Sequence, residues 1–320
     1  MNIFVIGCGR WGSLITWYLD RIGHHVTLYG RSSSKRMQAF LATRKNDLLA
    51  LPPSVALTTD LSAVNEAETV IISIGAQGLQ ALMEELSVYQ LKNKTFVLCM
   101  KGLEIGTGRR LSEIAKDNLD ASNHVAVWLG PGHVQEFYRG VPNCMVIDSD
   151  DEDTKRRLVE SFSGDLIRFY YGSDLIGNEI GAAAKNVVGI AAGLLDGLHL
   201  GSLKGALMSR GTREVARLIC ALGGRELSAY GLCHLGDYEA TVFSKYSHNR
   251  QFGESFARGE PYYDLAEGYY TVRAMLQLGE RYGVELPICQ AVYRILYENA
   301  APDDVLRDLL ARGLKGEFED

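Results

Sequence analysis

Residues 2–21 read NIFVIGCGRWGSLITWYLDR. The mostly apolar segment Asn2–Ile6 has the length and composition of a strand that is covered on both faces. Glycines follow at positions 7, 9 and 12, and a helical pattern continues from Gly12 to Arg21. A strand, a glycine-rich turn and a helix in this order begin a βαβ unit, which predicts a mainly parallel sheet.

The same alternation continues outward through the first half of the chain. Strands rich in Val, Ile and Leu are predicted at Asn2–Ile6, His25–Tyr29, Thr69–Ile74, Thr95–Cys99, Val125–Leu129 and Cys144–Ile147, and the last strand is expected near Leu166–Tyr171. Helices are predicted between them at Gly12–Arg21, Lys35–Leu41, Leu79–Glu85 and Gly108–Asp117. This order predicts an α/β fold, a doubly wound sheet of the Rossmann type.

From about Gly177 strand signals stop and long helical periodicity takes over. Helices are predicted at Asn178–Leu198, Lys204–Leu222, Tyr269–Tyr282, Pro287–Glu298 and Asp303–Arg312. We therefore expect the sheet to be followed by an all-α C-terminal domain, with the division between residues 1–177 and 178–320.

The composition is that of an ordinary globular protein, and it excludes several function classes. Lys and Arg number 33 against 39 Asp and Glu, and the net charge of −6 argues against a nucleic-acid partner or an anionic membrane surface. Six cysteines without a C-x-x-C pair indicate reduced thiols, and no His or Cys spacing predicts a metal site. The N-terminus lacks the pattern of a signal peptide and no long apolar run is present, so we expect a cytoplasmic protein without a membrane span.

The glycine loop, Gly7–Gly12, has the G-x-G-x-x-G spacing of a dinucleotide-binding turn. Gly7 permits the tight turn, Gly9 lets the backbone approach a pyrophosphate, and Gly12 lets the helix pack on the strand. The second predicted strand is followed by Arg31 and a run of hydroxyls and cations where NAD-selective sites carry an acidic residue. We expect the site to accept NADP(H), with Arg31 beside the 2′-phosphate, or both NADP(H) and NAD(H); an ordinary solvated loop would show the same residues.

Lys185 interrupts a long helix that is otherwise apolar and rich in small residues. A buried ammonium must face a cleft, pair with an anion or lose its proton, which makes it a candidate for acid–base chemistry, unless it reaches the surface as a structural lysine. Asn186 is a second polar group at the same place. Lys101 follows a predicted strand at the sheet edge where open α/β proteins bind ligands.

The chain resembles the bacterial-type NAD(P)-dependent glycerol-3-phosphate dehydrogenases over almost its whole length. The resemblance rests on GCGRWG, MKGLEIGTGRRLSEI, LGPGHVQE, AAAKNVVGIAAGLLDGL, SRGTREVARL, GLCHLGDYEAT, SHNRQFG and LPICQAVYRILYE. It implies hydride transfer between dihydroxyacetone phosphate and sn-glycerol 3-phosphate with NADP(H) or NAD(H), for phospholipid synthesis. A small phosphorylated substrate is therefore expected, and a homodimer is possible through the apolar helices of the second half.

The resemblance also implies residue roles. Lys185 would be the general acid and base, with Asp237 holding it and Lys101 contacting both cofactor and substrate. The implied substrate-binding residues are Lys101, Gly130, Gly132, Asn186, Ser247, His248 and Asn249. The implied cofactor-binding residues are Gly7, Gly9, Arg10, Trp11, Gly12, Arg31, Lys101, Val134, His248, Leu265 and Glu267.

Three positions depart from the family pattern, and all are expected near the substrate. His248 stands where an arginine is usual, Gly132 where a serine is usual, and Ser202 where an asparagine is usual. We expect a partly cationic His248 to hold the phosphate, with affinity falling as pH rises, and Arg250 and His133 to be able to turn inward. A reductase of another small keto substrate, or a catalytically silent NADPH-binding sensor, remains an alternative.

Overall fold

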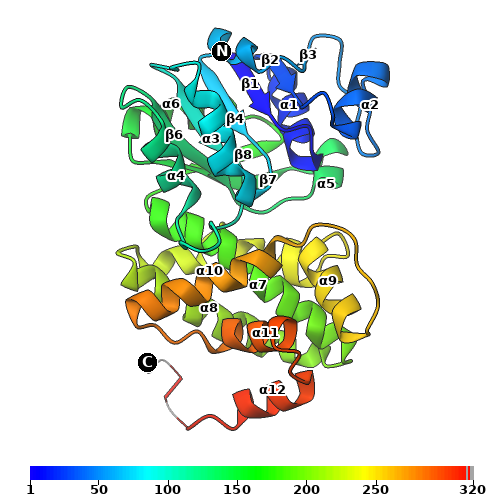
Figure 1. Cartoon of the computed structure of the whole chain (residues 1–320), viewed down its shortest axis with the longest axis vertical. Coiled ribbons are helices and arrows are strands. Elements are labelled where there is room, and N and C mark those ends of the chain that lie inside the picture. The colour runs from blue at the N-terminus through cyan, green and yellow to red at the C-terminus, as the bar shows by residue number, and fades with distance from the viewer. Residues whose placement is uncertain (315, 318–320) are drawn as a thin grey trace.

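The structure is a computed structural model that describes residues 1–314 and 316–317, and it consists of a sheet-containing half followed by a helical half (Figure 1). One eight-stranded sheet has the order β3-β2-β1-β4-β5-β6-β7-β8. All neighbouring strands are parallel except β6 and β7. The strands are β1 (Asn2–Ile6), β2 (His25–Tyr29), β3 (Ala56–Thr58), β4 (Thr69–Ile72), β5 (Thr95–Leu98), β6 (His124–Leu129), β7 (Asn143–Ser149) and β8 (Ile167–Tyr171).

The prediction of a doubly wound sheet is confirmed, with specific omissions. The three-residue strand β3 has no run of apolar residues long enough to be recognised in the sequence. The helices of this half are α1 (Arg10–Arg21), α2 (Lys35–Thr43), α3 (Leu79–Ser87), α4 (Leu111–Asn118), α5 (Val134–Tyr138) and α6 (Glu152–Phe162). The last two were not predicted, because α5 is short and α6 is strongly polar with only one face buried.

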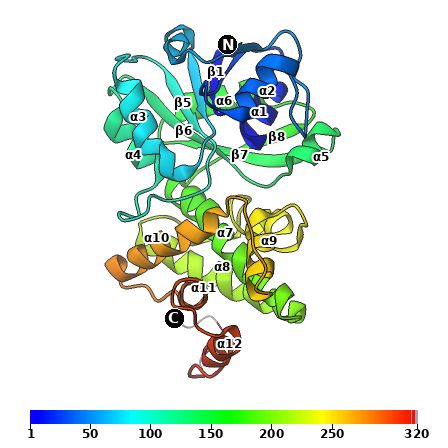
Figure 2. The same ribbon diagram turned by 45° about the vertical axis from the view of Figure 1, so that its right-hand side comes forward.

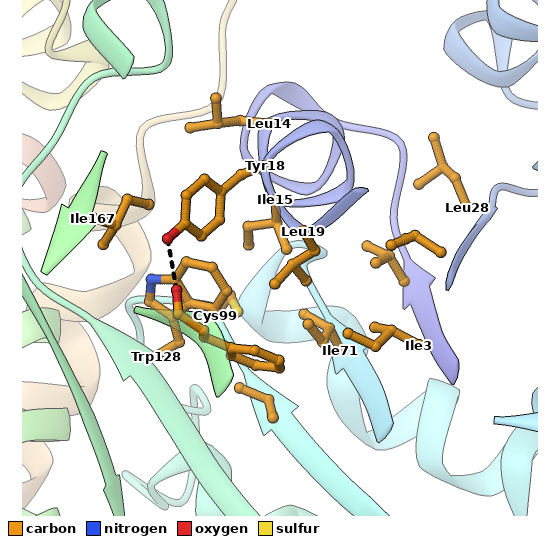
Figure 3. Close-up of a cluster of buried hydrophobic side chains, with 14 of the residues drawn as sticks. Ile3, Leu14, Ile15, Tyr18, Leu19, Leu28, Ile71, Cys99, Trp128 and Ile167 are labelled. Carbon is orange, nitrogen blue, oxygen red and sulfur yellow. Dashed lines mark hydrogen bonds between the residues drawn. The ribbon is translucent and has the colours of Figure 1, made fainter. Parts of the chain in front are cut away.

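Two apolar clusters fix the sheet between its helical layers. In the cluster drawn in Figure 3, Tyr18 on α1 lies against Trp128 on β6, with ring centroids 6.2 Å apart. The Tyr18 hydroxyl donates a 2.6 Å hydrogen bond to the carbonyl oxygen of Phe162, shown by the dashed line. This bond satisfies the polar end of a fully buried tyrosine and joins α1 to the end of α6.

The second half is helical, as predicted, and is organised around one central helix. Helix α7 leaves the sheet half and runs through the middle of the helical half, where α8, α9 and α10 pack against it (Figures 1 and 2). The helices are α7 (Leu175–Gly197), α8 (Lys204–Ala221), α9 (His248–Ala257), α10 (Glu267–Tyr282), α11 (Pro287–Tyr297) and α12 (Pro302–Leu310). Helix α9 was not predicted, and α7 begins three residues before the expected start.

The first turn of α7 is fastened to the sheet half by buried polar groups. The Glu179 carboxylate accepts hydrogen bonds from the amide and hydroxyl of Ser112 and forms a 2.8 Å ion pair with Arg110. Asn178 donates to Asp148 at the end of β7, over 2.8 Å. Lys185 lies six residues beyond Glu179, about 9 Å along the helix axis, so this attachment sets how far the lysine stands from the sheet.

Glycines bring α9 against α7 at backbone distance. A Cβ on Gly193 would lie 2.0 Å from the carbonyl oxygen of Arg250, and a Cβ on Gly253 would lie 2.2 Å from that of Ile190. Neither position therefore accepts a side chain without moving a helix. The close contact places the start of α9 beside the middle of α7.

Among the residues described, no helix has the length and apolar character needed to cross a membrane.

Candidate active site

The glycine loop has the shape that a dinucleotide pyrophosphate requires. Gly7 has a φ of +119°, and a Cβ there would lie 2.1 Å from the Ser73 carbonyl oxygen. A Cβ on Gly12 would lie 1.9 Å from the Gly7 carbonyl oxygen, so both glycines are required by close packing. At Gly9 the nearest atom would be a guanidinium nitrogen of Arg36, 4.0 Å away, which leaves that face of the loop open.

The amino end of α1 supplies unpaired amide groups at the same loop. Gly9 precedes the helix without a side-chain cap, and the first turn carries no acidic residue. The indole Nε1 of Trp11 is buried and has no partner in the part of the chain that the structure describes. Amide donors, a positive helix end and an open glycine fit a dinucleotide diphosphate.

Three charged side chains meet where the two halves of the molecule face each other. One oxygen of Asp237, Oδ2, lies 2.7 Å from Nζ of Lys101 and 2.7 Å from Nζ of Lys185. Lys101 also donates to the carbonyl oxygen of Gly130 at 2.6 Å, and Lys185 donates to Oγ1 of Thr241 at 2.8 Å. We call Lys101, Lys185, Asp237 and Thr241 the lysine cluster.

The surroundings of Lys185 bring its pKa closer to neutral pH. Burial lowers the pKa of Lys185 from its ordinary 10.5 to about 8; the charge of Asp237 opposes this lowering, and the charge of Lys101 adds to it. Lys185 is only 7 % exposed, so its ammonium is not a surface group. An amine with this pKa can act as acid or base near physiological pH.

Thr241 is a member of the cluster that sequence analysis did not assign. Its hydroxyl donates to the backbone carbonyl of Asp237 at 2.7 Å and accepts from Lys185. The residues Glu239–Phe243 form a π-helical turn, which carries Thr241 to the same side as Asp237. The only sign in the sequence was the four-residue spacing between Asp237 and Thr241 in GDYEAT, which would place them on one face of a helix. A π-helical turn cannot be recognised from one sequence.

Asn186 and Asn249 form a hydrogen-bonded chain that joins three helices to the sheet half. Asn186 donates to the backbone carbonyl of Lys101 at 2.8 Å and accepts from Asn249 at 3.0 Å. Asn249 accepts from the amide of Gly268 at 2.8 Å. Both asparagines therefore lie beside the lysine cluster, and they hold the backbone at Lys101 in position.

The surroundings of His248 differ from the expectation. Arg10 donates a 2.6 Å hydrogen bond to Nε2 of His248, and Nδ1 of His248 lies 2.8 Å from the hydroxyl of Tyr262. Because a guanidinium can only donate, Nε2 must be unprotonated and the imidazole neutral. Burial and the charges of Arg10 and Arg36 lower the pKa of His248, while Asp264 opposes them. The imidazole is therefore neutral in this structure, with the fixed cation of Arg10 beside it. That a bound phosphate makes His248 partly cationic stays a prediction.

The neighbours of His248 at the start of α9 also have fixed roles. Ser247 caps the helix, its hydroxyl accepting from the amide of Arg250 at 3.3 Å. The Arg250 side chain pairs with Asp196 at 2.6 Å and with Glu254 at 3.2 Å. In this structure Arg250 is thus held by carboxylates of α7 and α9, and an inward turn of its side chain on substrate binding stays a prediction.

The loop between β6 and α5 contains the two predicted glycines. Gly130 has a φ of +123° and Gly132 a φ of +149°. A Cβ on Gly132 would lie 2.1 Å from the ring of Phe137, so the aromatic ring occupies the space of the family's serine. Val134, the first residue of α5, is buried behind this loop.

The remaining residues predicted to bind the cofactor differ in their contacts and exposure. Glu267, at the start of α10, accepts a 3.4 Å hydrogen bond from the amide of Ala76, just beyond β4, and burial raises its pKa. Leu265 is exposed. Arg31 is also exposed and faces Glu85 at 3.6 Å, whereas Arg36 reaches the open side of Gly9.

No group of three or more His, Cys, Asp or Glu side chains that could hold a metal ion occurs among the residues described. A cavity of about 720 Å³ lies among α7, α8, α11 and α12, and none of the lysine cluster lines it. The chemistry is therefore concentrated at the junction of the two halves.

Comparison with known proteins agrees with this geometry. Residues 2–155 match the model of the NAD-dependent glycerol-3-phosphate dehydrogenase N-terminus, and residues 174–307 match that of its C-terminus. The glycerol-3-phosphate dehydrogenase [NAD(P)+] of Prosthecochloris aestuarii is 33% identical, over 99% of this chain and 100% of its own length. The Nitrosomonas eutropha protein of the same name is 35% identical, over 98% of each chain.

Among solved structures, the glycerol-3-phosphate dehydrogenase of Coxiella burnetii aligns with a TM-score of 0.91 and 27% identity, over 97% of this chain and 99% of that one. The match extends through the sheet, the helical half and the junction that holds the lysine cluster. This chain therefore belongs to the NAD-dependent glycerol-3-phosphate dehydrogenase family.

Proposed function

We propose that the protein interconverts dihydroxyacetone phosphate and sn-glycerol 3-phosphate with NADP(H) or NAD(H), and so supplies glycerophospholipid synthesis. The observation that carries the proposal is the lysine cluster, in which a buried amine from the helical half meets Lys101 from the sheet half on one carboxylate oxygen. A bound nicotinamide supplies or accepts the hydride. The protein binds and orients the substrate and the cofactor, and it moves the proton.

Lys185 is the proposed general acid and base. During reduction, hydride addition to the ketone carbon places negative charge on the ketone oxygen, and the Lys185 ammonium donates a proton to that oxygen. During oxidation, the neutral amine removes the hydroxyl proton. Asp237 orients both lysines, and Lys101 adds a second positive charge beside the developing oxyanion.

The substrate phosphate is proposed to bind at the start of α9, opposite Arg10. The guanidinium of Arg10 already extends to His248, and the amino end of α9 carries the positive end of a helix dipole. An arginine is always charged and can contact two phosphate oxygens, which a neutral imidazole cannot. In this proposal Arg10 supplies the charge that the family's arginine at position 248 would provide.

The proposal includes a cytoplasmic location, a homodimer and a division of roles between residues 1–177, which bind the cofactor, and residues 178–320, which carry the catalytic lysine. Exposed apolar residues of the helical half support the dimer, among them Leu310 at 73% exposure. Light scattering of the purified protein at several concentrations tests it. A monomer at every concentration would contradict the dimer without affecting the proposed reaction.

The direct test follows NADPH absorbance with dihydroxyacetone phosphate and identifies the product. Formation of glycerol 3-phosphate in equal amount to NADPH consumed is the expected result. A panel of small ketones without phosphate serves as the comparison. Turnover of one of these at a higher kcat/KM would overturn the substrate assignment, and no turnover of any would indicate a silent nucleotide-binding protein.

A further inference from the structure

His133 is a polar side chain of the junction that has no role in the chemistry above. Its Nε2 atom is buried and has no hydrogen-bond partner among the residues described. Leaving a buried polar atom unpaired costs on the order of 1–3 kcal/mol, so such atoms are normally completed by a partner. The unpaired nitrogen therefore indicates a place that a ligand completes.

The loop that carries His133 lies between the lysine cluster and the start of α9. Three residues earlier, Gly130 accepts the 2.6 Å hydrogen bond from Lys101. On the other side, the His133 ring meets the ring of Tyr246 edge-on, with centroids 5.5 Å apart and the planes at 67°. Tyr246 is two residues before His248, so His133 lies between the loop that accepts from Lys101 and the chain that leads into α9, close enough to feel the charges of the lysine cluster.

The charge of His133 indicates which kind of group it binds. Burial lowers its pKa, Lys185 and Lys101 lower it further, and Glu136 and Asp237 oppose them. The imidazole is therefore neutral at physiological pH, and a neutral ring pairs better with an uncharged hydroxyl than with a phosphate.

A second unpaired atom lies in the same site. The other oxygen of Asp237, Oδ1, is also buried without a partner among the described residues, while Oδ2 holds both lysines. A carboxylate oxygen only accepts, and a histidine nitrogen that carries hydrogen donates. A hydroxyl group can satisfy both at once, because it donates one hydrogen bond and accepts others.

We propose that His133 is a specificity-determining residue whose Nε2–H donates to the free terminal hydroxyl of the substrate, while that hydroxyl donates to Oδ1 of Asp237. This assignment rests on the proposed function, which places the neighbouring ketone oxygen at Lys185. The site then selects a hydroxyketone over a ketone that lacks the terminal hydroxyl. Without that hydroxyl both protein atoms stay unpaired, which is the costly outcome for a polar site.

The test compares dihydroxyacetone phosphate with hydroxyacetone phosphate, which lacks only the terminal hydroxyl. For the wild type we expect kcat/KM to be at least about 100-fold higher with the hydroxylated ketone. His133→Phe should lower that kcat/KM by about 10- to 100-fold and change the value for hydroxyacetone phosphate by less than about threefold. His133→Gln, which keeps a donor, should recover part of the preference.

Controls separate this role from simple packing. His124→Gln replaces an exposed histidine at the first residue of β6, the strand that precedes the loop of His133, and should change neither value. Equal losses with both ketones in His133→Phe, or an unchanged preference, would overturn the assignment. If the wild type reduces neither ketone, the proposed function fails, and this result is distinct from failure of His133 alone.

Discussion

The glycine loop and the lysine cluster are built in opposite ways. The loop is one contiguous segment, and its function depends on missing side chains: a Cβ at Gly7 or Gly12 would overlap the backbone. The cluster needs side chains from the loop after β5, the middle of α7, the short turn Leu235–Asp237 and the π-helical turn that follows it, and it exists only when these segments pack together. A local motif tolerates distant change, whereas an assembled site depends on the whole junction.

The largest effect should follow replacement of the central amine. Lys185→Met keeps the length and apolar stem but removes the proton, so kcat should fall by at least about 100-fold, as for a positioned general acid. NADPH affinity, measured by fluorescence titration, should stay within about twofold of the wild type, because the glycine loop lies in the other half of the molecule and is formed independently of Lys185.

Lys155→Met is the matched control, since Lys155 is an equally buried lysine on α6 that pairs with Glu152 and Asp148. Its kcat should match the wild type once the folded fraction is taken into account. A Lys185→Met enzyme that retained more than about one tenth of kcat would remove Lys185 from the chemistry.

The converse experiment is Gly12→Ala. Its Cβ would lie 1.9 Å from the Gly7 carbonyl oxygen, so the loop must move and NADPH affinity should fall by about tenfold or more, with a loss of stability of about 1–3 kcal/mol. Gly205→Ala is the control, because a Cβ added at this helical glycine would have no neighbouring atom within 4 Å, and this variant should bind NADPH normally. Equal affinities for the two variants would contradict the proposed role of the loop.

The same contrast explains what could be predicted from the sequence. The strands, the glycine loop and the buried Lys185 produce signals within one segment, and the fold followed from them. The shared oxygen of Asp237, the hydroxyl of Thr241 and the Arg10–His248 contact depend on residues up to 238 positions apart. Spacing along one chain carries no information on such distant pairs, so the Arg10 guanidinium beside His248 could not be predicted.

The pH dependence of kcat should follow the pKa of Lys185, whereas cofactor binding at the glycine loop should not depend on pH in this range. Because burial brings the pKa of Lys185 to about 8, the kcat for ketone reduction should decrease as pH rises through about 8 and the ammonium is lost. Oxidation needs the neutral amine, so its kcat should increase over the same range. NADPH affinity should be flat there. Parallel profiles in the two directions would show that another group controls the proton.

Arg10 lies in the glycine loop and reaches His248 at the start of α9. Its removal should have an effect of intermediate size. Arg10→Ala removes the proposed phosphate partner, so KM for dihydroxyacetone phosphate should rise by about tenfold with a smaller change in kcat. His248→Gln keeps a hydrogen-bond acceptor for Arg10 and should raise KM by less than about threefold. A larger effect for His248→Gln than for Arg10→Ala would move the phosphate contact back to position 248.

The smallest effect concerns the choice between NADPH and NADH. Arg31, expected to hold the 2′-phosphate, is exposed and faces Glu85, whereas Arg36 extends over the open side of Gly9. Arg36→Ala should therefore raise KM for NADPH by about three- to tenfold and KM for NADH by less, because NADH shares the diphosphate but lacks the 2′-phosphate, while Arg31→Ala changes either value by less than about twofold. Steady-state kinetics with both cofactors decides this. If Arg31→Ala had the larger effect on NADPH, the cofactor would draw Arg31 away from Glu85, and the loop after β2 would rearrange on binding.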